Sequence, residues 1–153
     1  MPSLYVLAKL LHVVAVVLFL GNTTLGLFWV AHAERTRDAR LIGHAMDGVI
    51  RSDRWFTMPG VVLIVIGGVA AAIIGGLKLL GTGWIAASIV LFTLSGVVFG
   101  AWLAPLQRKI VGAAASGASG ELDALLARWH RLGWLSVAPL WLAVAAMVLK
   151  WPA

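Results

Sequence analysis

Four long apolar runs dominate the pattern of hydrophobic and polar positions along this chain. The runs cover about residues 4–31, 56–77, 83–104 and 133–150. A helix needs roughly 20 apolar residues to cross a bilayer core of about 30 Å, and each run is close to that length. Because backbone polar groups in lipid must bond within their own segment, each run is expected to be helical. The pattern therefore predicts an all-α, polytopic membrane protein, with one domain over residues 1–153 built as a four-transmembrane-helix bundle.

The polar segments between the runs indicate shorter elements. Residues 34–54 carry charges of both signs and could continue the first helix into the cytoplasm, and Ser52 and Asp53 have side chains that cap a following helix. The glycine- and serine-rich stretch 112–120 is typical of a flexible link. Residues 121–132 place leucines and a tryptophan on one face, which predicts a short amphipathic helix on the inner membrane surface before the fourth span.

The basic residues are distributed unevenly along the chain. Nine of the 12 Lys and Arg residues lie in the two long segments that separate the first run from the second and the third from the fourth. Cytoplasmic loops of membrane proteins carry such an excess. We therefore expect a bacterial-type inner (plasma) membrane protein with both long loops cytoplasmic and both termini outside. The tryptophans expected in an aromatic belt at the inner interface are Trp29, Trp55, Trp102, Trp129 and Trp134.

The composition excludes several classes of partner and of chemical site. The chain is 61% hydrophobic with a mean hydropathy of +0.98, so the lipid bilayer must act as part of its solvent. The net charge of +6 then reflects topology and lipid headgroups, and no nucleic-acid partner is expected. The absence of cysteine excludes disulfides, thiolate metal sites and cysteine catalysis. No motif indicates an enzyme class, and none of the six acidic residues falls inside a predicted span, which argues against a carboxylate proton relay.

Glycine stripes in the second and third runs predict close helix packing. Residues 67–76 place small side chains four apart on two neighbouring stripes, and residues 96–100 form a GxxxG motif. Small residues let helix backbones approach closely in lipid. The stripes first indicate packing within one bundle, and a homodimer or a larger membrane complex is the alternative.

His12 is the most unusual residue of the first run. At 1.5 Å per residue it lies roughly 12 Å below the outer end of the span, between aliphatic neighbours that offer no hydrogen-bond partner. A polar side chain at that depth should face the bundle interior. Neutral imidazole is a good axial ligand of haem iron, so His12 is a candidate metal ligand. A hydrogen bond from His12 to a neighbouring helix is the structural alternative.

Few residues could complete a haem site with His12. The same level of the other helices holds no second histidine, and Met147 is the candidate for the opposite axial position. Lys9 and Lys150 lie near the outer ends, where they could pair with haem propionates, and Trp141 could pack on the porphyrin. Membrane anchoring explains Lys9 equally well, and helix packing explains Met147 and Trp141.

Stretches from all parts of the chain resemble one family. "LLHVVAVVLFLGN", "RSDRWFTMPGV", "WLAPLQRK" and "RWHRLGW…MVLKWP" resemble the predicted integral membrane family catalogued as domain of unknown function 2269. A D-W-F-T-P pattern is the most specific part of the resemblance. It corresponds here to Asp53, Trp55, Phe56, Thr57 and Pro59, with Arg54 inserted. The family implies a membrane protein without an established activity, and the residues alone assign no role to this pattern.

The first span also resembles two other families more distantly. Its "KLLH" start is similar to the HemJ-type protoporphyrinogen oxidases and the CopD-like copper-resistance membrane proteins. In the HemJ type, a histidine early in the first span is associated with haem b, which implies the same for His12. The later basic and histidine motifs of that family are absent here, so oxidase activity is not implied.

The leading hypothesis from the sequence is therefore a haem b-binding membrane protein with a redox or electron-transfer role and His12 as axial ligand. One alternative is a non-enzymatic accessory or assembly subunit of a larger membrane complex. Another is a copper or small-solute permeation protein that uses the face of His12 and Met147. Whether the chain is an enzyme is left open.

Overall fold

The fold consists of four long helical rods. The computed structural model describes residues 3–117 and 119–152, and it holds only helices and connecting turns there. The rods are α1 (Leu4–Glu34), then α2, η1 and α3 in continuous succession (Ala39–Ser52, Asp53–Thr57, Met58–Ile74), then α4, η2 and α5 (Gly83–Val98, Phe99–Leu103, Ala104–Ser116), and α6 (Ser119–Leu149). Each rod is long and apolar enough to cross a membrane. The predicted all-α protein with four transmembrane helices is confirmed.

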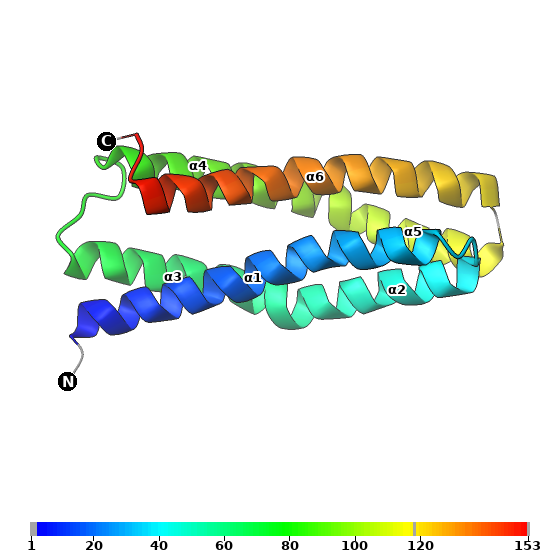
Figure 1. Cartoon of the computed structure of the whole chain (residues 1–153), viewed down its shortest axis with the longest axis horizontal. Coiled ribbons are helices and arrows are strands. Elements are labelled where there is room, and N and C mark those ends of the chain that lie inside the picture. The colour runs from blue at the N-terminus through cyan, green and yellow to red at the C-terminus, as the bar shows by residue number, and fades with distance from the viewer. Residues whose placement is uncertain (1–2, 118, 153) are drawn as a thin grey trace.

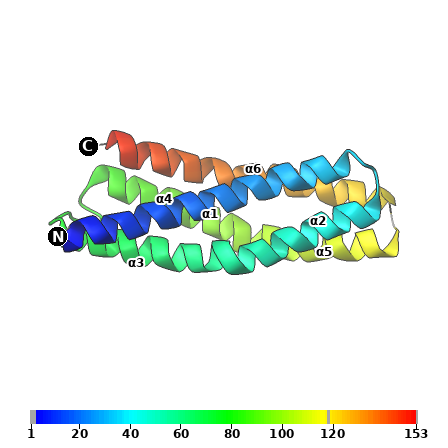
Figure 2. The same cartoon turned by 60° about the horizontal axis from the view of Figure 1, so that its bottom comes forward.

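The rods alternate in direction, so that both termini lie at one end of the molecule (Figure 1). We call this the terminal end, and it also holds the connection between α3 and α4. The opposite turn end holds the turns after α1 and α5 (Figures 1 and 2). At the terminal end α1 packs along α3 and α4 packs along α6, whereas toward the turn end α2 packs on α1 and α5, and α5 packs on α6. Two helix pairs thus merge into one bundle at the turn end.

The main core lies in the turn-end half of the molecule. A cluster of buried apolar side chains there joins all four rods; its most deeply buried members are Val30, Met46, Ile110 and Leu126. Rods of 31–36 residues are roughly 45–55 Å long at 1.5 Å per residue, which exceeds a bilayer core of about 30 Å. Because the charged residues concentrate in the turn-end half, we place the excess length there, as a packed bundle outside the hydrocarbon.

The segment between the first two apolar runs is helical instead of loop-like. α1 ends near Glu34, and a short turn in which Arg37 takes a positive φ of 54° leads into α2, with Asp38 as its N-cap. The charged segment therefore begins the second rod. The expectation that it would continue the first helix is wrong, because the chain reverses direction before residue 39.

The glycine-rich stretch and the amphipathic stretch that follows it also belong to long helices. α5 covers the first half of residues 112–120 and ends where Gly117 takes a φ of 73°, so the predicted flexible link is wrong. Residues 121–132 form the first part of α6. Their apolar face is buried against the other rods, with Leu122 and Trp129 each 3% exposed. The prediction of a separate interfacial helix is not confirmed, because this face completes the four-helix core.

Both middle rods contain a π-helical turn just before a proline. In η1 the backbone N–H of Met58 donates to the carbonyl of Asp53, five residues back, and Pro59 follows. η2 repeats this arrangement before Pro105. Proline has no N–H and its ring collides with the carbonyl four residues earlier in an α-helix. The wider π turn accommodates the ring, so each rod passes its proline without breaking.

Candidate functional site

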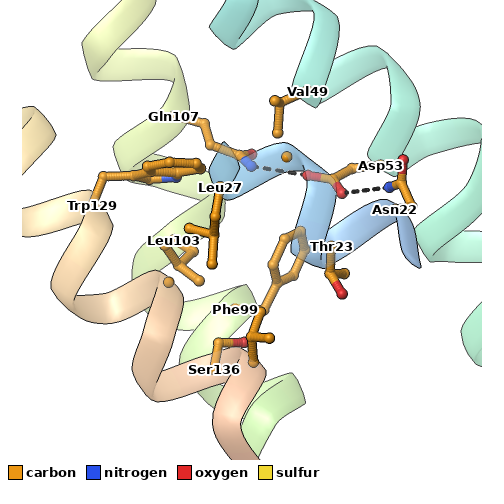
Figure 3. A pocket seen from close by; sticks show the side chains of 13 residues that line it. Asn22, Thr23, Leu27, Val49, Asp53, Phe99, Leu103, Gln107, Trp129 and Ser136 are labelled. Carbon is orange, nitrogen blue, oxygen red and sulfur yellow. Dashed lines mark hydrogen bonds between the residues drawn. The ribbon is translucent and has the colours of Figure 1, made fainter. Parts of the chain in front are cut away.

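Four polar side chains meet inside the apolar bundle, and Figure 3 shows three of them, Asn22, Asp53 and Gln107. Asn22 on α1, Asp53 and Thr57 in η1, and Gln107 on α5 form this cluster, which we call the polar centre. Asp53 Oδ1 accepts hydrogen bonds from Thr57 Oγ1 at 2.7 Å and from Asn22 Nδ2 at 3.3 Å. Asp53 Oδ2 accepts one from Gln107 Nε2 at 2.9 Å, and Asn22 Nδ2 also donates to Thr57 Oγ1 at 3.0 Å. A carboxyl group of the second rod thus links the first rod to the third.

The polar centre is shielded from the surroundings. Asp53 is 7% exposed, Thr57 2% and Gln107 5%. Every hydrogen bond that the structure gives to the Asp53 carboxyl comes from a neutral donor. Within residues 3–117 and 119–152, the ion pairs are Arg51 with Asp47 and His130 with Glu34, so no cationic side chain pairs with Asp53. A buried carboxylate without a positive partner is costly, which makes this centre unusual.

A small cavity adjoins the polar centre (Figure 3). Its volume is about 40 Å³, and its walls include Asn22, Asp53 and Gln107 together with Trp129 and Ser136 of α6. Such a cavity has room for a water molecule, which needs roughly 10–15 Å³. The indole N–H of Trp129 is buried and has no hydrogen-bond partner among the described residues. A water in the cavity would satisfy this donor, since buried polar groups are nearly always hydrogen-bonded.

Tryptophans mark the level of the polar centre on the outside of the bundle. Trp55 belongs to η1 beside Asp53, Trp102 belongs to η2, and Trp134 follows the cavity-lining Gly133. These three side chains are 74%, 46% and 57% exposed. Tryptophan is enriched at the membrane–water interface, so the polar centre lies near one boundary of the hydrocarbon. The expectation that Trp129 joins this belt is wrong, because its ring is buried in the core.

The structure gives Asp53 and Ser52 different roles from those expected from the sequence. They were expected to cap a helix starting at the second apolar run, but both lie inside a continuous rod over residues 39–74. Ser52 Oγ donates to the carbonyl of Val49, and the carboxyl of Asp53 faces Asn22 and Gln107. Asp53 therefore lies inside a helix that is long and apolar enough to cross a membrane, although no acidic residue was expected inside a span.

The sequence did contain an indication of this site. Positions 46, 49, 53, 57 and 60 are buried and follow steps of three or four residues, the spacing of one helix face. Asp53 and Thr57 occupy two of these inward positions. The family-like D-W-F-T-P pattern is explained in the same way: its acid and its threonine form the polar centre, its proline follows the π turn, and its two aromatic residues are exposed.

His12 packs on α3 instead of facing lipid. Its Nδ1 lies 2.8 Å from the carbonyl oxygen of Ile64, and Nδ1 must be the donor because a carbonyl only accepts. Gly67 lies against the His12 backbone and Gly68 against its ring, where an added Cβ would come within 3.0 Å of the ring atoms. At the level of His12, both small-residue stripes of residues 67–76 therefore pack within the chain. Nε2 of His12 has no hydrogen-bond partner in the part of the chain that the structure describes.

The other residues expected around a haem lie apart from His12 in the contacts observed. Trp141 and Met147 belong to α6, which packs along α4 at the terminal end, whereas His12 packs on α3. Trp141 is 51% exposed. Lys9 is exposed, with its Nζ 5.9 Å from the centroid of the Tyr5 ring, and Lys150 is exposed just after α6. The structure brings His12 together with Ile64 and the two glycines, and places Trp141 and Met147 on a different helix pair.

The remaining histidines lie toward the turn end. His130 Nε2 and Glu34 Oε2 are 2.6 Å apart and join α6 to the end of α1. His32 and His44 are exposed. Among residues 3–117 and 119–152, no group of three or more His, Cys, Asp or Glu side chains could hold a metal ion.

Comparisons with known proteins agree with this architecture. A family model described as "Predicted integral membrane protein (DUF2269)" matches residues 6–151. No curated protein and no solved structure matches the chain. Because the family model covers nearly the whole chain, the protein belongs to this family of predicted integral membrane proteins.

Proposed function

We propose that this protein binds haem b in the membrane for a redox or electron-transfer role, with His12 as an axial ligand. The observation that supports the proposal is the hydrogen bond from His12 Nδ1 to the Ile64 carbonyl. Metal-bound histidines almost always donate their second ring N–H to a carbonyl or carboxylate, which fixes the ring and leaves the other nitrogen free to coordinate. His12 has this arrangement, with Nε2 available.

The other expected residues keep supporting roles in the proposal. Met147 on α6 would have to approach His12 to serve as a second iron ligand, while Lys9 and Lys150 would contact the propionates and Trp141 would pack on the ring. Haem would supply one-electron chemistry. The chain's own contribution would be to orient the imidazole through the Ile64 carbonyl, and to surround it with apolar side chains of the bilayer-facing rods.

A visible spectrum tests the proposal. The protein is purified in mild detergent from haem-replete cells, and we expect a Soret band that His12→Ala abolishes. The matched control is His32→Ala, because His32 is exposed toward the turn end. A colourless wild-type protein, or a Soret band that survives His12→Ala, would overturn the proposal.

The second candidate is an accessory subunit of a larger membrane complex. The observation that favours it is the GxxxG motif of α4 and η2: Gly96 and Gly100 are exposed, and an added Cβ would meet nothing within 4 Å at either position. This motif is therefore available to another chain. We would expect a larger complex in native gels that Gly96→Leu disrupts and Gly112→Leu, at an exposed glycine of α5, leaves intact.

Copper or small-solute permeation stays a prediction, which uptake into vesicles would test.

We further propose that the protein resides in a bacterial-type inner membrane with both termini outside. The distribution of basic residues supports this orientation, because the turn-end segments hold most of them.

A further inference from the structure

We propose that the polar centre binds one monovalent cation at Asp53, either a proton or a sodium ion, taken from the aqueous side nearest the turn end. The inference does not depend on haem binding, because it uses neither His12 nor any residue near it. Charge, ligand chemistry and access each support it.

The Asp53 carboxyl has no positively charged partner among the described residues. Asp53 is 7% exposed and lies between apolar rods, and its hydrogen-bond donors Asn22, Thr57 and Gln107 are all neutral. Neutral donors stabilise a carboxylate but do not cancel its charge. Charged groups at membrane depth are almost always paired. Among the described residues no cationic side chain pairs with Asp53, and Arg54, the next residue, is exposed. A positive charge must therefore come from a ligand.

The polar centre offers oxygen ligands. Carboxylate, amide carbonyl and hydroxyl oxygens are the donors that hard cations prefer. Asp53 supplies two oxygens, Thr57 one, and the amide oxygens of Asn22 and Gln107 become available if the two amides turn over. A proton needs less rearrangement, because Asp53 Oδ2 accepts only the bond from Gln107 and can carry a hydrogen toward the cavity.

A cavity beside Asp53 gives water and a small cation room to reach the carboxyl group. The cavity of about 40 Å³ beside Asp53 can hold water, and the unpaired indole N–H of Trp129 lines it. Water in this position would hydrate the carboxyl group. The exposed Trp55, Trp102 and Trp134 place the centre near a membrane boundary, so a cation from that side crosses little hydrocarbon.

Two measurements on the wild-type protein test the proposal. Infrared difference spectroscopy at neutral pH detects the carbonyl stretch of a protonated carboxyl, and thermal unfolding is recorded with sodium against choline. A protonated carboxyl without any sodium effect identifies the ligand as a proton. If sodium is the ligand, no such band appears in sodium buffer, and the unfolding midpoint rises by roughly 5–10 °C at about 100 times the dissociation constant.

Variants assign the result to Asp53. Asp53→Asn keeps the shape of the side chain and should remove the band or the sodium effect. Asp47→Asn is the matched control, because Asp47 is on α2, pairs with Arg51 and lies nearer the surface. A wild-type protein with neither a protonated carboxyl nor a sodium effect would overturn the proposal, and so would an effect that persists in Asp53→Asn. Because the wild-type measurements stand alone, the proposal remains testable if this variant does not fold.

Discussion

At the scale of single residues, the fold depends on polar groups that are hydrogen-bonded inside an apolar bundle. Asp53 receives hydrogen bonds from side chains of three rods, and Gln107 is the donor contributed by the third of them. His12 depends in the same way on the carbonyl of Ile64 and on the space left by Gly68. The glycines matter as much as the polar groups, since they let the helices approach.

Replacing Gln107 should weaken the bundle. Gln107→Leu leaves Asp53 Oδ2 without its donor, and a buried acceptor that loses its partner costs about 1–3 kcal/mol. Unfolding in a mixed-detergent titration would measure this loss. The neighbouring exposed Arg108 provides the control: Arg108→Leu should change stability by no more than about 0.5 kcal/mol. Equal stability of the two variants would contradict the role assigned to Gln107.

Adding one methyl group at Gly68 should disturb His12. The new Cβ would lie 3.0 Å from the ring, so that the imidazole or the helix must shift, at a cost of about 1–3 kcal/mol. Gly96→Ala is the comparison, because nothing lies within 4 Å of its added Cβ. There we expect a neutral effect or a gain of roughly 0.5–1 kcal/mol. Thermal unfolding of both variants measures the difference, and the absence of one would show that the ring is free to move.

At the scale of elements, the sequence predicted the apolar parts of the helices well and the polar parts poorly. Hydropathy finds a segment that must face lipid, because almost every residue of it is apolar. The turn-end halves of the rods carry most of the charged residues, so their charges and glycines resemble those of loops. Asp53 was assigned to a helix N-cap because an acidic residue directly before an apolar run is typical of a capping position. Its partners lie 31 and 54 positions away in the chain and cannot be recognised from local pattern.

The start of α6 allows a test of this interpretation. Leu126 is 2% exposed within the core, so Leu126→Ala should cost about 2–5 kcal/mol. Leu41 on α2 is 49% exposed, and Leu41→Ala should cost clearly less. Chemical unfolding in detergent distinguishes them. A helix that merely rested on the membrane surface would give similarly small losses for both substitutions.

At the scale of the whole molecule, the four alternating rods place the chain ends at one end of the bundle and the turns after α1 and α5 at the other (Figure 1). The apolar runs and the basic segments predicted this alternation. They could not predict how far the bundle extends past the lipid, because that depends on packing between α2, α5 and the start of α6. Nor could they predict that α1 packs mainly along α3, and α4 mainly along α6, at the terminal end.

Single cysteine reporters would test the orientation, since the natural chain has no cysteine. Leu80→Cys lies in the exposed connection between α3 and α4, and Arg37→Cys lies in the turn after α1. In intact cells with a permeabilised outer envelope, a membrane-impermeant maleimide should label the first and spare the second. The reverse pattern would invert the proposed orientation, and labelling of both would contradict the alternation of the rods.

The hydrogen bond between Gln107 and Asp53 also has a consequence for the order of assembly. Asn22, Asp53 and Thr57 all belong to the first helical hairpin, which leaves the ribosome before the residues of α5 exist. Nascent chains fold from the N-terminal side. The early hairpin must therefore keep the aspartate near water until the second hairpin arrives. Asp53 then leaves water only when the second helical hairpin docks on the first and brings Gln107 to it. An insertion intermediate halted before residue 107 should therefore still expose Asp53 to aqueous reagents.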